Sequence, residues 1–256
     1  MVPLSGPHPG GATLVAVRGE AVRFPVTLAV AQTARDIPSG DGKYVYEPKF
    51  DGWRCCAWTS RGRLHSRSGT DITDRFPEIM PAVGDLGDVV LDGELVALRQ
   101  DPPRLDFAAL QASPQRRRVQ AVGVYFMVFD VLACEGQDLR WQPYRERREV
   151  LIEHVTNGAG RAQLVANTSD RHAAREWMDP AYGTVGIEGV VSKRIDAAYR
   201  GRCGWWKTRT TVTTEAAVLG VTSRWCWDAP TGRASGGPWA CPSRSCARPA
   251  SSCSIM

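Results

Sequence analysis

Lysine is scarce in this 256-residue chain: only four of its 32 basic residues are lysines, at Lys43, Lys49, Lys193 and Lys207. A coding preference for arginine would account for that scarcity, and the four remaining lysines would then have no particular function. A chemical explanation is also open, because a buried lysine can lose its proton and act as a nucleophile or base, whereas arginine stays protonated. Lys49 and Lys207 stand in aromatic, strand-like sequence rather than on a polar face. Lys49 is therefore a candidate reactive residue.

Long apolar runs are also missing. The most apolar stretch, residues 119–134, is interrupted by Asp130 and is too short to span a membrane, so we expect a buried strand there. Residues 1–20 have no basic region ahead of an apolar one, which argues against a secretory signal and favours a cytoplasmic protein. The net charge of +5 is mild, so it permits an anionic partner without requiring one.

Cysteines at metal-binding spacing are missing as well. Four of the eight cysteines are scattered along the main part of the chain, where we expect reduced thiols in or near the core: Cys55, Cys56, Cys134 and Cys203. The other four have neither a Cys-x-x-Cys pair nor a nearby histidine, which disfavours a zinc site: Cys226, Cys241, Cys246 and Cys253.

The two ends of the chain differ in composition from its middle. Residues 1–20 are rich in Gly and Pro and are expected to form a loose arm. Residues 224–256 are rich in Ser, Pro, Arg and Cys, and Ile255 is their only branched aliphatic residue. We expect this tail to be disordered or frame-shifted, because it offers too little apolar surface to fold. The folded domain is therefore expected to cover residues 21–223.

The middle of the chain alternates strand-like and helical patterns, with room for one large or two modest domains. The predicted strands cover residues 43–50, 54–60, 63–68, 88–98, 122–132, 163–166, 187–194 and 214–222. The predicted helices cover residues 76–86, 106–111, 143–155 and 169–182. Strands without strict βαβ alternation favour an α+β domain with more than one antiparallel sheet. Two basic runs are expected on the surface, a loop at 116–118 that could follow a phosphate backbone and a helix face at 145–149.

Short polar insertions interrupt the apolar strands, and a buried charge is costly unless it is paired or binds a ligand. In chain order they are EPKFDGWR (47–54), SRSGTD (66–71), LDGEL (91–95), YFMVFD (125–130), EGVVSKR (188–194) and WWKTR (205–209). Each one alone has an ordinary structural explanation. LDGEL fits a hairpin turn, EGVV fits the start of a strand, and Phe129 fits a core position. Six such motifs in one order are hard to explain in that way.

This series resembles the nucleotidyltransferase motifs of ATP-dependent DNA ligases, especially those of the bacterial repair type. The resemblance covers residues 24–222 and implies an adenylation domain of antiparallel sheets flanked by helices. In that family a lysine attacks the α-phosphate of ATP, which forms lysyl-AMP and releases pyrophosphate. The AMP passes to a DNA 5′-phosphate, and the neighbouring 3′-hydroxyl displaces it to seal a nick. The implied partners are ATP, Mg²⁺ or Mn²⁺, and nicked double-stranded DNA in repair, recombination or replication, with the protein as a monomer.

The resemblance assigns Lys49 as the residue that becomes adenylated, a role that arginine could not fill because guanidinium does not deprotonate. Glu47 is expected at the edge of the adenine and Phe129 against its face. Arg54 and Glu94 would hold the ribose. Stacking combined with a few polar contacts is the usual composition of a nucleotide pocket.

Charged side chains are expected around the phosphates. Arg67 would contact a phosphate or the adjacent sugar, and Lys207 would lie on the α-phosphate, where it would counter the charge of the transition state. Glu188, with Asp51 or Glu94, offers carboxylate oxygens suited to magnesium. Two further residues complete the expected nucleotide contacts: Lys193 and Arg209.

The sequence departs from the family pattern in two ways. Arg209 stands where the family usually has a lysine, and a planar fork binds phosphate with a different geometry from a point charge. Family members also continue into an oligonucleotide-binding barrel that clamps DNA and carries a last basic motif. Residues after Ser223 have no alternating strands to build that barrel, so we expect a truncated enzyme that seals nicks poorly.

Two alternatives stay open. An RNA ligase or a capping-type transferase would use the same lysine chemistry, and labelling with ATP against GTP, or nicked DNA against nicked RNA, would distinguish them. A catalytically dead nucleotide-binding remnant is favoured by the unusual tail and disfavoured by the intact Lys49. A covalent AMP adduct would exclude the remnant.

Overall fold

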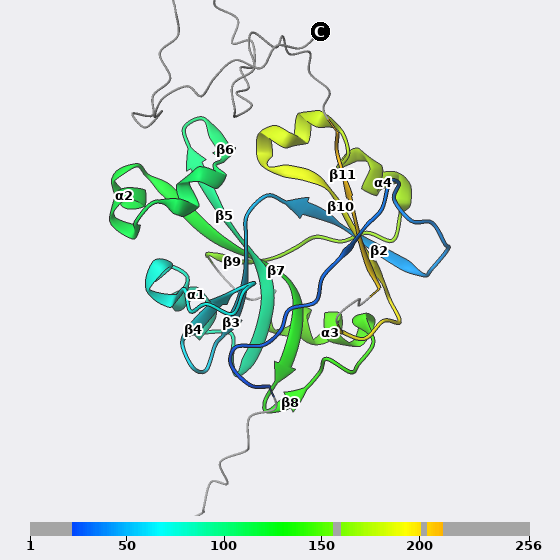
Figure 1. Ribbon diagram of the computed structural model, residues 1–256, viewed down its shortest axis with the longest axis horizontal. Helices are drawn as coiled ribbons and strands as arrows, with labels where there is room; N and C mark the ends of the chain where they lie inside the picture. Colours follow the sequence, from blue (N-terminus) through cyan, green and yellow to red (C-terminus); the bar gives the residue numbers. More distant parts are fainter. Residues whose placement is uncertain (1–21, 156–159, 201–203, 212–256) are drawn as a thin grey trace, which may run out of the picture. The chain divides into compact units, whose positions relative to one another are not determined.

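The structure is a computed structural model that describes residues 22–155, 160–200 and 204–211. The expected arm at 1–20, the strand at 214–222 and the tail at 224–256 all lie outside these ranges. The described chain forms two β-sheets with short helices around them (Figure 1). The predicted α+β fold with more than one antiparallel sheet is therefore confirmed, although each sheet also contains one short parallel pairing.

The smaller sheet has the strand order β1-β11-β10-β2. Its strands are Gln32–Thr33 (β1), Trp205–Arg209 (β11), Ile187–Arg194 (β10) and Tyr44–Phe50 (β2). β10 is antiparallel to both β11 and β2, whereas β1 is parallel to β11. The motifs EPKF, EGVVSKR and WWKTR thus become neighbours in one sheet, although they are far apart in the chain.

The larger sheet has the order β4-β3-β5-β7-β8, with β6 added on β5 and β9 on β7. Its strands are Arg63–Ser66 (β4), Trp53–Trp58 (β3), Val89–Gln100 (β5), Pro103–Leu105 (β6), Val122–Cys134 (β7), Gln137–Asp138 (β8) and Ala162–Leu164 (β9). Only Asp51 and Gly52 separate β2 from β3. The KFDGWR motif therefore crosses directly from one sheet to the other.

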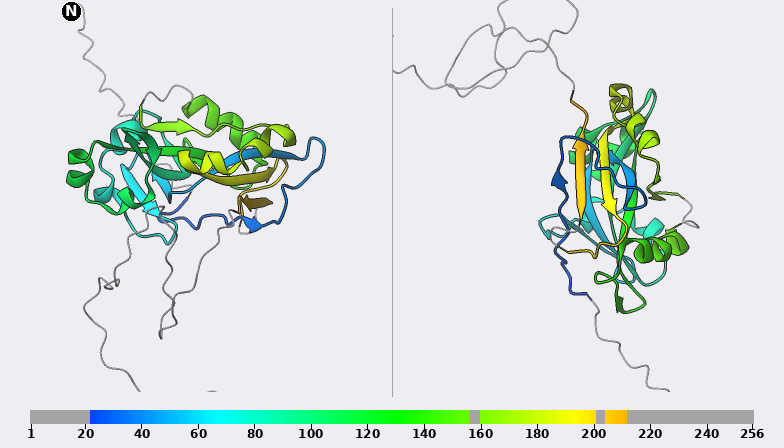
Figure 2. Two further views of the ribbon diagram at one scale, coloured as in Figure 1. Left: turned by 90° about the horizontal axis from the view of Figure 1, so that it is seen from above. Right: turned by 90° about the vertical axis from the view of Figure 1, so that its right-hand side faces the viewer.

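The helices are short. They are Met80–Gly84 (α1), Pro114–Val119 (α2), Tyr144–Val155 (α3) and Arg171–Glu176 (α4), with 3-10 turns at Thr73–Arg75 (η1), Phe107–Gln111 (η2) and Pro180–Val185 (η3). The two views of Figure 2 show α3 and the blue segment that begins at Val22 on different sides of the strands. No helix in the described ranges is long and apolar enough to cross a membrane.

Two predicted helices are shorter than expected. The pattern at 76–86 is helical only over α1, although Phe76 and Ile79 before it are fully buried. The prediction at 169–182 is divided into α4 and η3, because Asp179 is extended ahead of Pro180 and caps the second segment through Ala181 N–H. A residue before proline is disfavoured in helical conformation, and proline suits a first turn.

Two large apolar clusters hold the elements together, beside a small third one of Ile37, Tyr46, Ala174 and Val190. The larger one packs the inner face of β5 and β7 against Phe76, Ile79 and Leu151 from the helical segments. The second cluster joins the segment that begins at Val22 to the larger sheet and to Trp205 of β11. Within the described ranges, three cysteines are free thiols: Cys55, Cys56 and Cys134. The expectation for Cys203 lies outside these ranges.

The helix face at 145–149 is not a surface face throughout, which corrects the sequence prediction. Arg147 and Arg148 of α3 are buried. The guanidinium of Arg147 donates to both oxygens of Asp130 at 2.7 and 2.8 Å, and neither side chain is exposed. Helical spacing turns these arginines inward. Asp130 within an apolar strand supplies the charge that permits the burial of Arg147, and Arg148 donates to the Val165 carbonyl oxygen at 2.7 Å.

The basic run at 116–118 is also different from the expected loop. It lies in α2, where Ser113 caps the first turn and accepts from the Arg116 amide. Arg117 is 1% exposed and pairs with Glu78 at 2.9 Å. Arg117 is thus a structural residue, and only Arg116 and Arg118 remain on the exposed side.

Candidate active site

A cavity of about 330 Å³ lies between the two sheets, where β2 crosses into β3. All the charged and aromatic residues singled out as nucleotide or metal contacts line it: Glu47, Lys49, Asp51, Arg54, Arg67, Glu94, Phe129, Glu188, Lys193, Lys207 and Arg209. They come from six strands and two loops, so their convergence is a property of the tertiary structure. The cavity is also lined by Ala29, Val30 and Ala31 of the N-terminal segment.

Lys49 reaches the cavity from the end of β2, with 17% of its side chain exposed. Its ammonium pairs with the carboxylate of Glu188 in β10. The β2–β10 register shifts between Ile187 and Val190, which places a bulge at Glu188. A β-bulge changes the direction in which nearby side chains point, and here the Glu188 carboxylate beside the bulge contacts the Lys49 ammonium.

Two glycines allow the backbone to pack this closely. A Cβ on Gly52 would lie 2.2 Å from the Leu95 carbonyl oxygen, so only glycine lets the β2–β3 connection approach β5. Gly189 has φ of 145°, and a Cβ there would lie 2.1 Å from the Thr208 carbonyl oxygen. Steric contact with the neighbouring backbone therefore explains why Gly52 of KFDG and Gly189 of EGVV are glycines.

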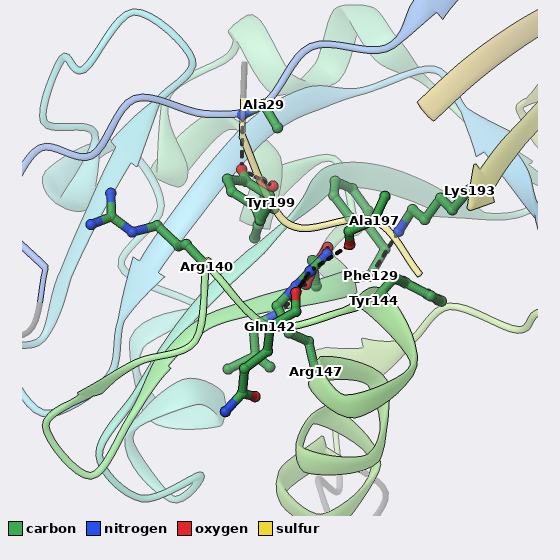
Figure 3. Close-up of polar contacts among 12 residues, drawn as sticks. Ala29, Phe129, Arg140, Gln142, Tyr144, Arg147, Lys193, Ala197 and Tyr199 are labelled. Carbon is green, nitrogen blue, oxygen red and sulfur yellow. Dashed lines mark hydrogen bonds and ion pairs between the residues drawn. The ribbon is translucent and has the colours of Figure 1, made fainter. Parts of the chain in front are cut away.

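Arg54 is held by a buried carboxylate. Its Nε and Nη2 donate to the two oxygens of Asp92 at 2.6 Å each, and Asp92 is fully buried. The Tyr199 hydroxyl donates to Asp92 at 2.6 Å and accepts from the Ala29 amide at 3.0 Å (Figure 3). Arg54 is thus fixed by its pair with Asp92, and its guanidinium lies 4.6 Å from the Phe129 ring centroid.

Glu94 lies beside this pair on β5. Burial raises the pKa of its carboxyl to about 7, although Arg54 and Lys49 act in the opposite direction. Asp92 and Asp51 raise it further, because like charges disfavour ionisation. Glu94 can therefore change its protonation state near neutral pH.

Glu47, Lys193 and Tyr144 form a second buried network at the other side of Phe129. Lys193 pairs with Glu47 at 2.8 Å and donates to the Phe129 carbonyl oxygen at 2.8 Å. The Tyr144 hydroxyl donates to Glu47 at 2.7 Å. Figure 3 shows Lys193 beside Phe129 and Tyr144. Arg147, which lies in α3 like Tyr144, donates to the carbonyl oxygens of Gln142 and Ala197.

Besides Arg54 and Lys193, four cationic residues line the cavity: Lys49, Arg67, Lys207 and Arg209. Burial lowers the pKa of Lys207, and the neighbouring charges of Arg209, Lys49 and Arg67 lower it further. Arg209 is 3.4 Å from Glu188 and more than half exposed. Such a cluster fits an anionic group with several oxygens, as in a polyphosphate.

The carboxylates Glu188 and Asp51 are close enough to influence each other. Burial raises the pKa of Asp51, and Glu188 raises it further. Among the described residues there is no group of three or more His, Cys, Asp or Glu side chains that could hold a metal ion. Magnesium binds few protein ligands and completes its coordination with phosphate and water, so this pair fits a metal shared with a nucleotide.

Three aromatic residues of the site were not identified as functional positions from the sequence: Tyr144, Tyr199 and Trp205. Trp205 was visible only as the first letter of WWKTR. Tyr144 begins a helix, and Tyr199 lies in the connection from β10 to β11, so neither carried a local pattern. Tyr144 and Tyr199 are identified as site residues only by their hydrogen bonds, to Glu47 and Asp92 respectively.

The fold and this cavity define the nucleotidyltransferase domain of a ligase, and comparison with known proteins agrees. The family model for the ATP dependent DNA ligase domain matches residues 28–209. The chain belongs to the ATP-dependent DNA ligase family. The resemblance drawn from the six motifs is thereby confirmed.

The curated relatives are longer than this chain. DNA ligase C1 of Mycolicibacterium smegmatis is 32% identical over 190 residues, which are 70% of this chain and 54% of the relative. The multifunctional non-homologous end joining protein LigD of Pseudomonas aeruginosa is 34% identical over 187 residues, which are 71% of this chain and 22% of the relative. The chain thus spans about half of the first relative and less of the second.

Solved structures match over a similar share of the chain. Mycobacterial DNA ligase D complexed with ATP and MES has a TM-score of 0.56 and 30% identity, over 71% of this chain and 58% of that one. The ligase domain of LigD from M. tuberculosis gives the same TM-score with 29% identity.

Proposed function

We propose that this chain is an adenylating enzyme in which Lys49 forms a covalent bond with AMP. The Lys49 nitrogen attacks the α-phosphorus of ATP, a P–N bond forms, and the bond to pyrophosphate breaks while the amine releases a proton. The observation that carries the proposal is the position of Lys49, in the nucleotide-sized cavity and paired with Glu188. A covalent intermediate divides one difficult transfer into two easier ones.

The base and ribose would occupy the inner end of the cavity. Glu47 would accept a hydrogen bond from the adenine, and Phe129 would stack on it. Arg54, already oriented by Asp92, would bind the ribose together with Glu94. A guanidinium that is fixed before binding loses little conformational entropy when the ligand arrives.

The phosphates would lie among the cations of the cavity. Lys207 and Arg67 would contact the α-phosphate region, and Lys193 would act from beneath the base. Arg209, in the position where the family usually has lysine, would bind phosphate by its fork after leaving Glu188. Magnesium or manganese would be held by Glu188 with Asp51 or Glu94, and it would neutralise phosphate charge when bound.

The second half of the reaction would join DNA. AMP would move from Lys49 to the 5′-phosphate at a nick in double-stranded DNA, and the adjacent 3′-hydroxyl would then displace AMP. Membership of the ATP-dependent DNA ligase family supports this choice of polymer. We propose that the protein acts as a monomer in DNA repair.

The test of this function is a mass measurement after incubation with ATP and magnesium. We expect an AMP adduct that maps to the peptide containing Lys49. Labelling by ATP and not by GTP, and transfer to nicked DNA in preference to nicked RNA, would separate ligation of DNA from RNA ligation and capping. A chain that binds ATP and never forms the adduct would contradict the proposal.

A further inference from the structure

The ammonium of Lys193 is buried beside Glu47 and Phe129, the two residues that we propose bind the adenine base. The residue is 1% exposed, and it lies on β10 between Ser192 and Arg194. Its Nζ lies 2.8 Å from Glu47 Oε2 and donates to the Phe129 carbonyl oxygen at 2.8 Å (Figure 3). Lys193 thus connects the two residues to which we assign the edge and the face of the base.

Three aromatic rings surround this ammonium. The distances from Nζ to the ring centroids are 4.4 Å for Trp205, 4.6 Å for Phe129 and 4.9 Å for Tyr144. Burial lowers the pKa of Lys193, while Glu47 acts to raise it. Aromatic faces attract a cation most strongly where water is excluded, so the rings offset part of the desolvation of the charge.

The carboxylate of Glu47 is held from two directions by donors. The Tyr144 hydroxyl donates to Oε1 at 2.7 Å, and Lys193 approaches Oε2. An ionised carboxylate has about four acceptor sites and no donor. Glu47 lines the cavity, so the acceptor sites that remain can serve a ligand there.

We propose that Lys193 is a positioning residue that makes the base site selective for a purine with an amino group at C6, by holding Glu47 as an oriented hydrogen-bond acceptor and anchoring Phe129. This inference rests on the proposed function, because it presumes that the cavity receives a nucleotide base between Glu47 and Phe129. It gives Lys193 a task distinct from contact with the phosphates.

The chemistry of the bases explains the selectivity. Adenine presents an amino donor where guanine presents a carbonyl acceptor, so an acceptor-only carboxylate attracts the first and repels the second. Without Lys193, the Glu47 carboxylate would keep only the Tyr144 hydroxyl as a donor that orients it, and Phe129 would lose its anchor at the carbonyl oxygen. Loss of Lys193 would therefore weaken ATP binding and also reduce discrimination against GTP.

The main variant is Lys193→Met, which keeps a similar length and removes the charge. We expect its KM for ATP in lysyl-AMP formation to rise at least tenfold, and its preference for ATP over GTP to fall at least tenfold. Lys43→Met, at an exposed position just before the same sheet, is the matched control and should leave both quantities unchanged. Thermal unfolding followed by circular dichroism would establish that each variant is folded.

A second, more conservative variant tests the inference even if Lys193→Met does not fold. Tyr144→Phe removes one donor to Glu47 and keeps the ring, so the ATP preference should fall in the same direction by a smaller factor. Tyr125→Phe, on β7 and outside the cavity lining, is its control. In a Glu47→Gln background, Lys193→Met should change the ATP preference little further, because the two residues act through one carboxylate.

The outcomes distinguish this inference from the proposed function. If the wild-type chain forms the adduct and folded Lys193→Met and Tyr144→Phe keep its ATP preference, the role of Lys193 is wrong and the proposed function stands. Full additivity of Lys193→Met with Glu47→Gln would equally refute action through Glu47. A wild-type chain that neither binds ATP nor forms an adduct would overturn both.

Discussion

The ammonium of Lys49 on β2 pairs with the carboxylate of Glu188 on the neighbouring strand β10, where the register between the two strands shifts. The pair joins the nucleophile that we propose to the residue that we expect to bind the metal. Each group therefore neutralises the other. Binding of ATP with its metal would have to separate them before the amine could attack.

Substitution of the nucleophile should abolish adduct formation entirely. Lys49→Arg is expected to be as inactive as Lys49→Ala, because guanidinium does not deprotonate. Lys43→Arg, at an exposed lysine outside the cavity, should form the adduct like the wild type. Intact-protein mass spectrometry after incubation with ATP and magnesium is the measurement. Adduct formation by either Lys49 variant would assign the chemistry to another residue.

Removal of the Glu188 carboxylate should act on the rate more than on nucleotide affinity. We expect Glu188→Ala to lower the magnesium-dependent rate of adduct formation by at least tenfold, with a smaller effect on ATP binding. Glu176→Ala, on the exposed part of α4, serves as the control. The rates are measured over a magnesium titration. An unchanged magnesium dependence would remove Glu188 from the metal site.

The Phe129 ring should contribute to base binding. Phe129→Ala is expected to weaken ATP binding by about 1–3 kcal/mol, the range measured for bases stacked on aromatic rings. Phe129→Leu, which keeps apolar volume without a flat face, should lose most of the same affinity while preserving the fold. Phe107→Ala, at a residue 39% exposed and outside the cavity, is the control. Calorimetric affinities equal to that of the wild type would make Phe129 a packing residue only.

Glu94 should make the stability of the metal-free protein depend on pH. Burial raises its pKa from 4.5 to about 7, so the folded state holds a proton that the unfolded state releases in this interval. Stability contributed by the neutral form is complete below about pH 4.5 and is lost as pH rises toward 7. Glu94→Gln should therefore be more stable than wild type at pH 8 by about 1–3 kcal/mol, and little different at pH 4.

Urea denaturation in EDTA without nucleotide, at both pH values, measures this difference in unfolding free energy. Glu135→Gln, on the turn after β7 and away from the cavity, is a suitable comparison. A stability difference that stays the same between pH 4 and pH 8 would contradict the shifted titration of Glu94.

The ion pair of Arg147 and Asp130 should be important for stability. Arg147→Ala leaves a buried aspartate without its cation and is expected to lower the unfolding free energy by about 3–5 kcal/mol. Arg147→Met together with Asp130→Leu should recover much of that loss, since an apolar pair has no charge to desolvate. Arg145→Ala, exposed on the same helix, should have little effect. Equal melting behaviour of the Arg147 and Arg145 variants would show that the buried pair is dispensable.

Much of the fold was predictable because the strands that build it carry strong local patterns. β2, β3, β5, β7 and β10 lie where alternating or continuous apolar runs predicted them. The short strands β1, β6 and β8 were missed, because two or three residues carry no periodic signal and depend on a neighbouring strand for their hydrogen bonds. The division of the 169–182 helix followed from Pro180, whose effect on the preceding residue the prediction underestimated.

The sequence by itself determined which residues to expect in the cavity, since the order and chemistry of six motifs identify a family, and the fold brings these residues together. The tertiary structure decided which of them touch. Arg54 pairs with Asp92, Lys193 is enclosed by three rings, and Arg147 turns inward to Asp130. Each of these contacts joins residues distant in the chain and depends on strand register and on the balance between burial and charge. Local sequence patterns do not contain that information.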